Sequence, residues 1–115
     1  MIANGLVVER IAGAREDEQI IRLRGALTLN NLFDFQTAIR SETHKIQIID
    51  FSEVSYVDSA GVGSLIGGFI AAQKSGRRLI LVGLNERVKV LLQMTNVANL
   101  FPTYETLSQA EAALV

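Results

Sequence analysis

Two segments near the start of the chain have the composition of β-strands. They cover residues 7–11 and 19–24 and are rich in branched apolar residues. In the second segment the apolar residues alternate with Arg22 and Arg24, so we expect one face of this strand to be solvated. The stretch between them, Ala-Gly-Ala-Arg-Glu-Asp-Glu, is charged and contains glycine. The pattern predicts a β-hairpin with a solvated loop.

The spacing of apolar residues becomes helical after this hairpin. Leu32, Phe35 and Ile39 recur at intervals of three and four residues, as they do on the buried face of an amphipathic helix. Asn31 stands directly before them and can cap the first turn with its side-chain oxygen. We therefore expect a helix over about residues 31–42.

Two later segments are short, apolar and rich in branched residues. Residues 46–51 read Ile-Gln-Ile-Ile-Asp-Phe, and residues 77–83 read Arg-Arg-Leu-Ile-Leu-Val-Gly. Such runs are typical of strands that are covered on both faces. A helical segment separates them, and another follows Asn85, which can cap it. Asn96 can take the left-handed conformation that ends this helix.

The last elements are a short strand near Thr103 and a helix that opens at Thr106, where Thr-Leu-Ser-Gln has the spacing of a capping box. The predicted order is β, β, α, β, α, β, α, β, α. Strand–helix–strand connections cross over right-handed, so the central strands are expected to run parallel. The fold class is therefore α/β: one domain over residues 1–115, with a mixed sheet, a parallel core, an N-terminal hairpin and about four helices.

Composition excludes several classes of protein. The 115 residues include 11 Lys and Arg against 12 Asp and Glu, with no basic block that could neutralise a run of phosphates, so nucleic-acid binding is not expected. The absence of cysteine excludes disulfides and thiolate metal sites. The longest uncharged apolar stretch, residues 60–72, is shorter than the roughly 18 residues that a membrane span needs. With no secretion signal at the N-terminus, we expect a cytoplasmic protein.

The most informative stretch covers residues 50–68, where a polar segment ends in Asp58-Ser59 and a glycine-rich helix begins. Aspartate and serine are common helix caps because their oxygens accept the free amides of the first turn. The same geometry also suits a phosphorylation site, since the amides and the helix dipole favour negative charge. A phosphate on Ser59 would add about 1.5 to 2 negative charges and change which partner can dock there.

The predicted helix carries four glycines, at positions 61, 63, 67 and 68. Each glycine costs about 1 kcal/mol relative to alanine in a helix, so their number indicates that the helix backbone approaches something closely. That neighbour is either the sheet beneath the helix or a partner above it.

The sequence resembles the STAS domain of bacterial anti-sigma-factor antagonists. Seven consecutive positions of the motif at residues 57–63 agree, in the expected strand, loop and helix context. The resemblance extends over nearly the whole chain. It includes the segments Leu23-Arg24-Gly25-Ala26-Leu27-Thr28, Asp50-Phe51-Ser52, Val57-Asp58-Ser59-Ala60-Gly61-Val62-Gly63, Val88 to Asn96, and Leu100-Phe101.

This resemblance implies a partner-switching protein that is not an enzyme and needs no cofactor. The unphosphorylated antagonist binds an anti-sigma factor that is also a serine kinase, and so releases a sigma factor. The kinase phosphorylates the serine after the motif's aspartate, here Ser59 after Asp58, and a serine phosphatase reverses the reaction. The implied partner-binding residues are Asp58, Ser59, Ala60, Gly61, Val62, Gly63, Asn30 and Asn31.

The sequence departs from the family pattern in three places, of which the mildest is Asn96 where a glycine is frequent at a helix end. Ala60 stands where many relatives carry a second hydroxyl, so Ser59 has no alternative acceptor beside it. Ala26 replaces a frequent acidic residue after the strand-end glycine, and Asn30 or Asn31 replaces the next acidic position. A second reading therefore stays open: a STAS scaffold that is never phosphorylated, as an accessory of a lipid-transport ATPase or a stress-sensing assembly.

Other chemistries fit the sequence poorly. A dinucleotide site would need a third glycine that Gly61-Val62-Gly63 lacks at the required spacing, and the chain has no P-loop. The only histidine, His44, is expected at a solvated helix end rather than beside Ser59 as a catalytic base, and it cannot form a zinc site alone.

The remaining charged and aromatic residues have simpler structural explanations. The carboxylates at 50, 53 and 58 are explained by separate cap and strand-end roles, without acid–base chemistry. The arginines at 22, 24, 77 and 78 are expected to be solvated, and the phenylalanines at 33, 69 and 101 to lie mostly in the core.

Overall fold

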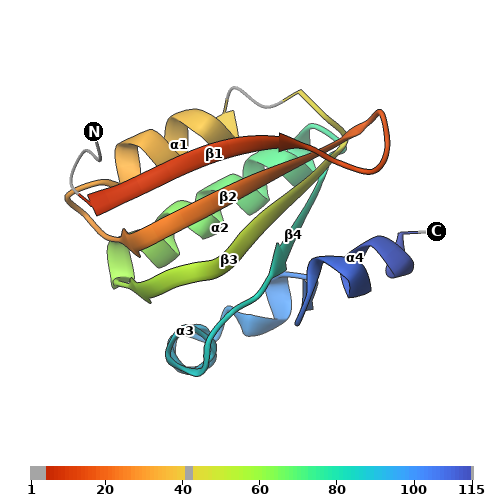
Figure 1. Ribbon diagram of the computed structural model, residues 1–115. Helices are drawn as coiled ribbons and strands as arrows, with labels where there is room; N and C mark the ends of the chain where they lie inside the picture. Colours follow the sequence, from red (N-terminus) through yellow and green to blue (C-terminus); the bar gives the residue numbers. More distant parts are fainter. Residues whose placement is uncertain (1–4, 41–42, 115) are drawn as a thin grey trace.

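The computed structural model describes residues 5–40 and 43–114, which form one α/β fold around a five-stranded sheet (Figure 1). The strands follow their sequence order across the sheet. The first pair is antiparallel and all later pairs are parallel, so the predicted mixed sheet with an N-terminal hairpin is confirmed. The strands are β1 (Leu6–Ala12), β2 (Glu18–Leu27), β3 (Ile46–Val57), β4 (Arg78–Val82) and β5 (Thr103–Tyr104).

The helices begin close to the predicted positions. Asn85 caps its helix by accepting the N–H of Val88 at 2.9 Å, and Asn96 adopts the expected left-handed conformation with φ 60°. Thr106 likewise accepts the N–H of Gln109 at 3.1 Å. The predicted end of the first helix at residue 42 lies outside the described residues. The helices are α1 (Leu32–Arg40), α2 (Ser59–Lys74), α3 (Glu86–Met94), the short 3₁₀ helix η2 (Ala98–Leu100) and α4 (Leu107–Ala113).

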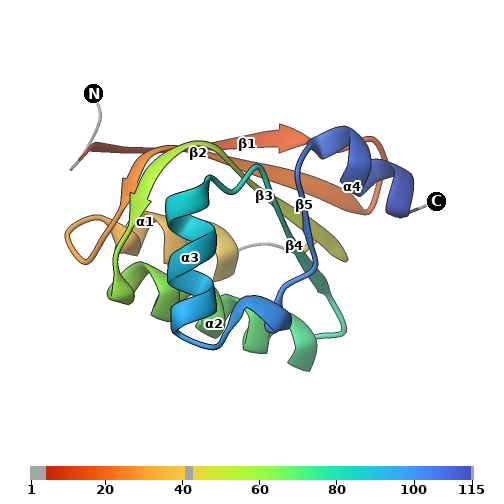
Figure 2. The ribbon, with the colours of Figure 1, turned by 90° about the horizontal axis from the view of Figure 1, so that it is seen from below.

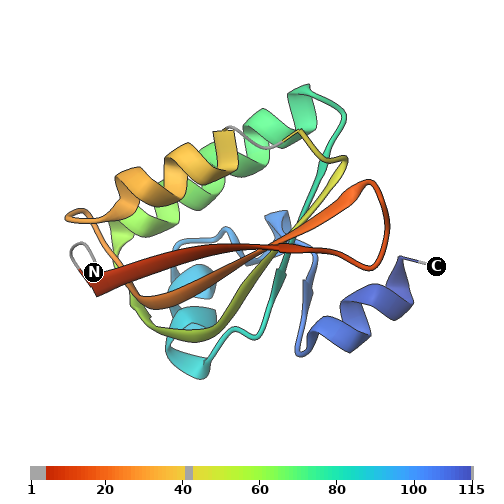
Figure 3. The same ribbon diagram turned by 45° about the horizontal axis from the view of Figure 1, so that its top comes forward.

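The sheet is covered on both faces, but unequally. Side chains alternate along each strand, so Ile49 and Leu81 face the larger core with α1, α2 and α3, whereas Ile48 and Ile80 face a smaller cluster under α4. Figure 3 shows α1 and α2 lying together along one side of the sheet and α4 on the other. The all-apolar segments predicted as central strands are thus buried on both sides.

The third strand is longer than the pattern predicted. We expected a strand over residues 46–51 followed by a polar loop, but β3 continues to Val57 and pairs with β2 over its whole length. Register shifts in the β2–β3 pairing interrupt the simple alternation, so that only Val54 and Val57 are buried in its last six residues. This extension carries the chain directly to the start of α2.

Charged side chains on β1, β2 and β3 pair between neighbouring strands. Arg22 Nε lies 3.2 Å from the carboxylate of Asp50, and Arg24 pairs with Glu53 at 3.0 Å and with Glu9 at 3.3 Å. These arginines are therefore ion-paired rather than only solvated. Asp50 and Glu53 have separate structural roles as predicted, but both lie inside the strand and not at its end.

Candidate functional site

The candidate site is built where β3 ends and α2 begins. Asp58 is the N-cap of α2: its Oδ1 accepts the N–H of Gly61 at 2.8 Å. Its Oδ2 accepts the N–H of Leu29 at 3.0 Å, and its own N–H donates to the carbonyl of Leu27 at 3.1 Å. One side chain thus fixes both the start of α2 and the loop that follows β2.

The loop of residues 28–31 is held by Asn31. The side-chain oxygen of Asn31 accepts the N–H of Thr28 at 2.9 Å, and its amide donates to the carbonyl of Ala26 at 2.8 Å. The N–H of Leu32 donates to the carbonyl of Thr28, so the first helical turn already starts at that residue. Asn31 is 4% exposed and acts at the third position of this turn, bonding back to Thr28.

Ser59 is the first residue of α2 and is exposed. The capping oxygen belongs to Asp58, and within the described residues the hydroxyl of Ser59 has no hydrogen bond. Its side chain is therefore available to solvent, to a partner or to a modifying enzyme. The free N–H groups and the dipole of a 16-residue helix lie behind it.

The other residues of the predicted partner-binding set divide into two groups. Asn30 and Gly63 are exposed and Ala60 is partly exposed. Val62 faces the core at 3% exposure, and Gly61 and Asn31 are buried. A Cβ at Gly61 would lie 2.7 Å from the carbonyl oxygen of Leu27, so the close approach of α2 to the β2 end requires glycine there. The buried residues shape this surface without being part of it.

Exposed apolar side chains flank Ser59 on two sides. Leu29 is 72% exposed on the loop that Asp58 holds against the start of α2, and Phe33, in the first turn of α1 that follows this loop, is 65% exposed. Phe33 was expected in the core, and that prediction is wrong because its position on α1 faces away from the sheet. On the other side, Tyr56, Val90 and Met94 are between 43% and 75% exposed. Contiguous exposed apolar patches are a common feature of interaction surfaces.

A shallow groove of about 220 Å³ lies between the start of α2 and α3. Figure 2 shows α3 in front of the sheet near this end of α2. Arg87 brings a cation to the groove, and its guanidinium carbon lies 6.0 Å from the centre of the Tyr56 ring. The groove is lined by Tyr56, Val57, Asp58, Ser59, Arg87, Val90, Leu91 and Met94.

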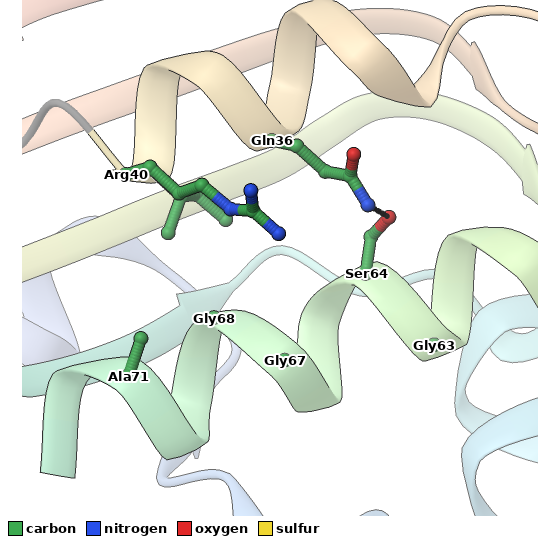
Figure 4. Close-up of a pocket in the computed structure, with 8 residues that line it drawn as sticks. Gln36, Arg40, Gly63, Ser64, Gly67, Gly68 and Ala71 are labelled. Carbon is green, nitrogen blue, oxygen red and sulfur yellow. Dashed lines mark hydrogen bonds between the residues drawn. The ribbon is translucent and has the colours of Figure 1, made fainter. Parts of the chain in front are cut away.

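A second hollow, of about 190 Å³, separates α1 from α2 (Figure 4). Its floor is the α2 backbone at Gly67 and Gly68, and the Arg40 side chain extends over it. At its far end, Nε2 of Gln36 donates to the hydroxyl oxygen of Ser64 at 3.1 Å, which ties the two helices together.

Sequence reasoning placed Ser59 but missed most of the surface around it. Leu29, Arg87 and Met94 are each about 30 residues from Ser59 in sequence, and no local pattern brings them to it. His44 precedes β3 and Ser59 follows it, so the whole 12-residue strand separates the two residues and a Ser–His pair does not form. Among residues 5–40 and 43–114, no cluster of three His, Asp or Glu side chains could hold a metal ion, and no helix is long and apolar enough to cross a bilayer.

Comparisons with known proteins point to one family. The family model of the STAS domain matches residues 8–110 of this chain. An anti-sigma-B factor antagonist of Listeria monocytogenes is 36% identical over 52 residues, which is 45% of this chain and 46% of the relative, so the match spans about half of either protein.

Solved structures share the fold at low identity. The crystal structure of an anti-sigma factor antagonist from Mycobacterium paratuberculosis has a TM-score of 0.82 at 18% identity, over 94% of this chain and 92% of that one. The phosphorylated form of the Bacillus cell fate determinant SpoIIAA has a TM-score of 0.70 at 20% identity, over 95% of this chain and all of that one (100%).

Proposed function

Because this chain belongs to the STAS domain family and is similar to anti-sigma factor antagonists, we propose that it is a cytoplasmic partner-switching module controlled at Ser59. Unphosphorylated, it binds an anti-sigma factor that is also a serine kinase and thereby frees a sigma factor. The bound kinase then switches the module off. The γ-phosphoryl group of ATP passes to the Ser59 oxygen, the bond to ADP breaks and the hydroxyl proton is released. A serine phosphatase hydrolyses the phosphoserine and restores binding.

The observation that carries this proposal is the state of the Ser59 hydroxyl. It is exposed at the first position of α2 and makes no hydrogen bond within the described residues, because Asp58 supplies the cap. Phosphate can therefore be added without breaking a contact that the fold needs. The solved SpoIIAA structure in its phosphorylated form is a relative with the same fold.

Phosphate on Ser59 changes the surface that a partner would cover. The exposed side chains of Leu29 and Phe33 on one side and Met94 on the other suit an apolar contact. Burying about 1.5 to 2 added negative charges in such a contact is costly unless they are paired. A 100-fold loss of affinity corresponds to about 2.8 kcal/mol, which the loss of a few good contacts can account for.

The direct test is phosphorylation by candidate anti-sigma kinases from the same genome. The protein is incubated with each kinase and ATP, and the phosphate is mapped by mass spectrometry. We expect modification at Ser59, none in Ser59→Ala, and full modification in Ser55→Ala, which removes a nearby exposed hydroxyl. Phosphate at another residue with Ser59 untouched would overturn the site. A stable complex that is indifferent to ATP would instead support the scaffold reading.

A further inference from the structure

We infer that Arg87 pairs with the phosphate on Ser59 and so holds the modified serine inside the groove between α2 and α3. This inference rests on the proposed modification of Ser59 and names the residue that pairs with the phosphate. The two side chains line the same groove, from different helices. Their juxtaposition is produced by the fold, since they stand 28 positions apart in the sequence.

Two contacts place Arg87 near Ser59. The side-chain amide of Asn85 donates to the carbonyl of Val54 at 3.0 Å, which fixes the start of α3 against the end of β3. The Arg87 guanidinium then lies over the ring of Tyr56, three residues before Ser59 in the chain. Arginine is long and flexible enough to reach from this ring to a phosphate on the neighbouring helix start.

The charge of Arg87 is not committed elsewhere. Its one interaction among the described residues is the contact with the Tyr56 ring, and no carboxylate pairs with it. The neighbouring cation on the same helix behaves differently: Lys89 lies 3.7 Å from both Glu86 and Glu105. A guanidinium that still has all its hydrogen-bond donors is well suited to a phosphate, which it can bind through two parallel bonds.

The carboxylate of Asp58 does not compete for Arg87. Among the residues that the structure describes, it is the only acidic group that lines the groove, and both of its oxygens already accept backbone N–H groups, of Gly61 and Leu29. A phosphate on Ser59 therefore becomes the strongest acceptor in the groove. Pairing with Arg87 would draw it across Tyr56 and cover part of the apolar surface that Val90 and Met94 expose.

The test uses protein with phosphoserine incorporated at position 59 during translation, so it needs no kinase. The second pKa of the phosphate is measured by ³¹P NMR titration in the otherwise unchanged protein, in Arg87→Gln and in Lys89→Gln. A nearby cation lowers the pKa of a phosphate, so Arg87→Gln should raise it by about half a unit while Lys89→Gln leaves it unchanged. Arg87→Lys should restore most of the lower value, because it keeps the charge.

Two results would overturn the inference: an equal phosphate pKa with and without Arg87, or the same rise in the Arg87 and Lys89 variants. The ¹H–¹⁵N spectrum of each variant shows whether it is folded, and Arg87→Ala, which also removes the charge, replaces Arg87→Gln if that variant does not fold. Because the phosphoserine is incorporated during translation, a pKa shift would demonstrate the pairing even if no kinase modified Ser59. Conversely, an unshifted pKa would not affect the outcome of the kinase assay that tests the proposed function.

Discussion

Asp58 and Leu29 are 29 residues apart, and the Asp58 carboxylate accepts the backbone N–H of Leu29 at 3.0 Å. The other oxygen of the same carboxylate caps α2 through Gly61. The helix that carries Ser59 and the loop that presents Leu29 are therefore held by a single side chain. The surface around Ser59 has a defined shape because these two segments cannot move independently.

Replacement of Asp58 by alanine should destabilise the protein and release the loop. Loss of the cap and of the second hydrogen bond is expected to lower the free energy of unfolding by about 1 to 2 kcal/mol, measured by urea denaturation. The amide of Leu29 should also exchange its hydrogen faster. Asn85→Ala is the matched control, since it removes the cap of α3. It should lower stability without changing exchange at Leu29, and equal exchange in the two variants would contradict this account.

The glycines of α2 should respond in opposite ways to alanine. A Cβ at Gly61 would lie 2.7 Å from the Leu27 carbonyl oxygen, so Gly61→Ala should destabilise the fold. A Cβ at Gly63 or Gly67 meets nothing within 4 Å. Gly63→Ala and Gly67→Ala should each stabilise the helix by up to about 1 kcal/mol. Thermal unfolding of the three variants tests this directly. A destabilised Gly67→Ala variant would contradict the open space that the structure shows around Gly67.

The two apolar side chains beside the site should matter for binding and not for folding. Leu29 and Phe33 are mostly exposed, so Leu29→Ser and Phe33→Ser are expected to change stability by less than about 0.5 kcal/mol. If they form part of the partner surface, each should weaken binding of the anti-sigma factor about tenfold in calorimetry. Leu100→Ser, at 40% exposure at the end of η2, is the control and should bind as the unchanged protein does. Unchanged affinity in both test variants would place the partner surface elsewhere.

The carboxyl groups of Glu18 and Glu111 lie together between the hairpin loop and α4. The Glu18 side chain is fully buried and accepts the N–H of Ala14 at 2.9 Å and a guanidinium N–H of Arg15 at 3.1 Å. Its hydrogen bond to Glu111, together with burial, raises the pKa of Glu111 to about 7. Burial also acts to raise the pKa of Glu18, but the hydrogen bonds from Glu111, Ala14 and Arg15 outweigh it and the pKa is lowered.

Stability should therefore fall as pH rises from about 5 to 7. Between the ordinary glutamate pKa of 4.5 and about 7, folded Glu111 keeps a proton that the unfolded chain has released, so the free energy of unfolding decreases with pH. We expect a loss on the order of 1 to 2 kcal/mol between pH 5 and 8 in urea titrations. Glu111→Gln, which stays neutral, should flatten this dependence. The exposed Glu105→Gln is the control, and equal slopes in the unchanged protein and Glu111→Gln would contradict the shared proton.

The local parts of the fold could be predicted because each has a local cause. Caps at Asn85 and Thr106 and the left-handed Asn96 depend on side chains within a few residues of the backbone that they satisfy. The extension of β3 to Val57 could not be read in the same way. The irregular pairing with β2 breaks the two-residue period, so a paired strand has the hydropathy pattern of a loop.

The candidate site shows the same limit. Ser59 stands next to its capping residue, so both could be identified from one motif. The bond from Asp58 to Leu29, the ring of Tyr56 under Arg87 and the exposure of Phe33 all depend on how separate elements pack. No single-sequence pattern encodes those distances. The position of Ser59 at the start of α2 was therefore predictable, whereas the arrangement of the side chains around it was not.

The most direct test of the central claim is the affinity of the cognate anti-sigma kinase for two forms of this protein, one with serine and one with phosphoserine at position 59. Isothermal titration calorimetry with a non-hydrolysable ATP analogue prevents turnover during the measurement. We predict tight binding of the serine form and an affinity at least about 100-fold weaker for the phosphoserine form, a difference of about 2.8 kcal/mol. Equal affinities would show that the charge on Ser59 does not control which partner binds.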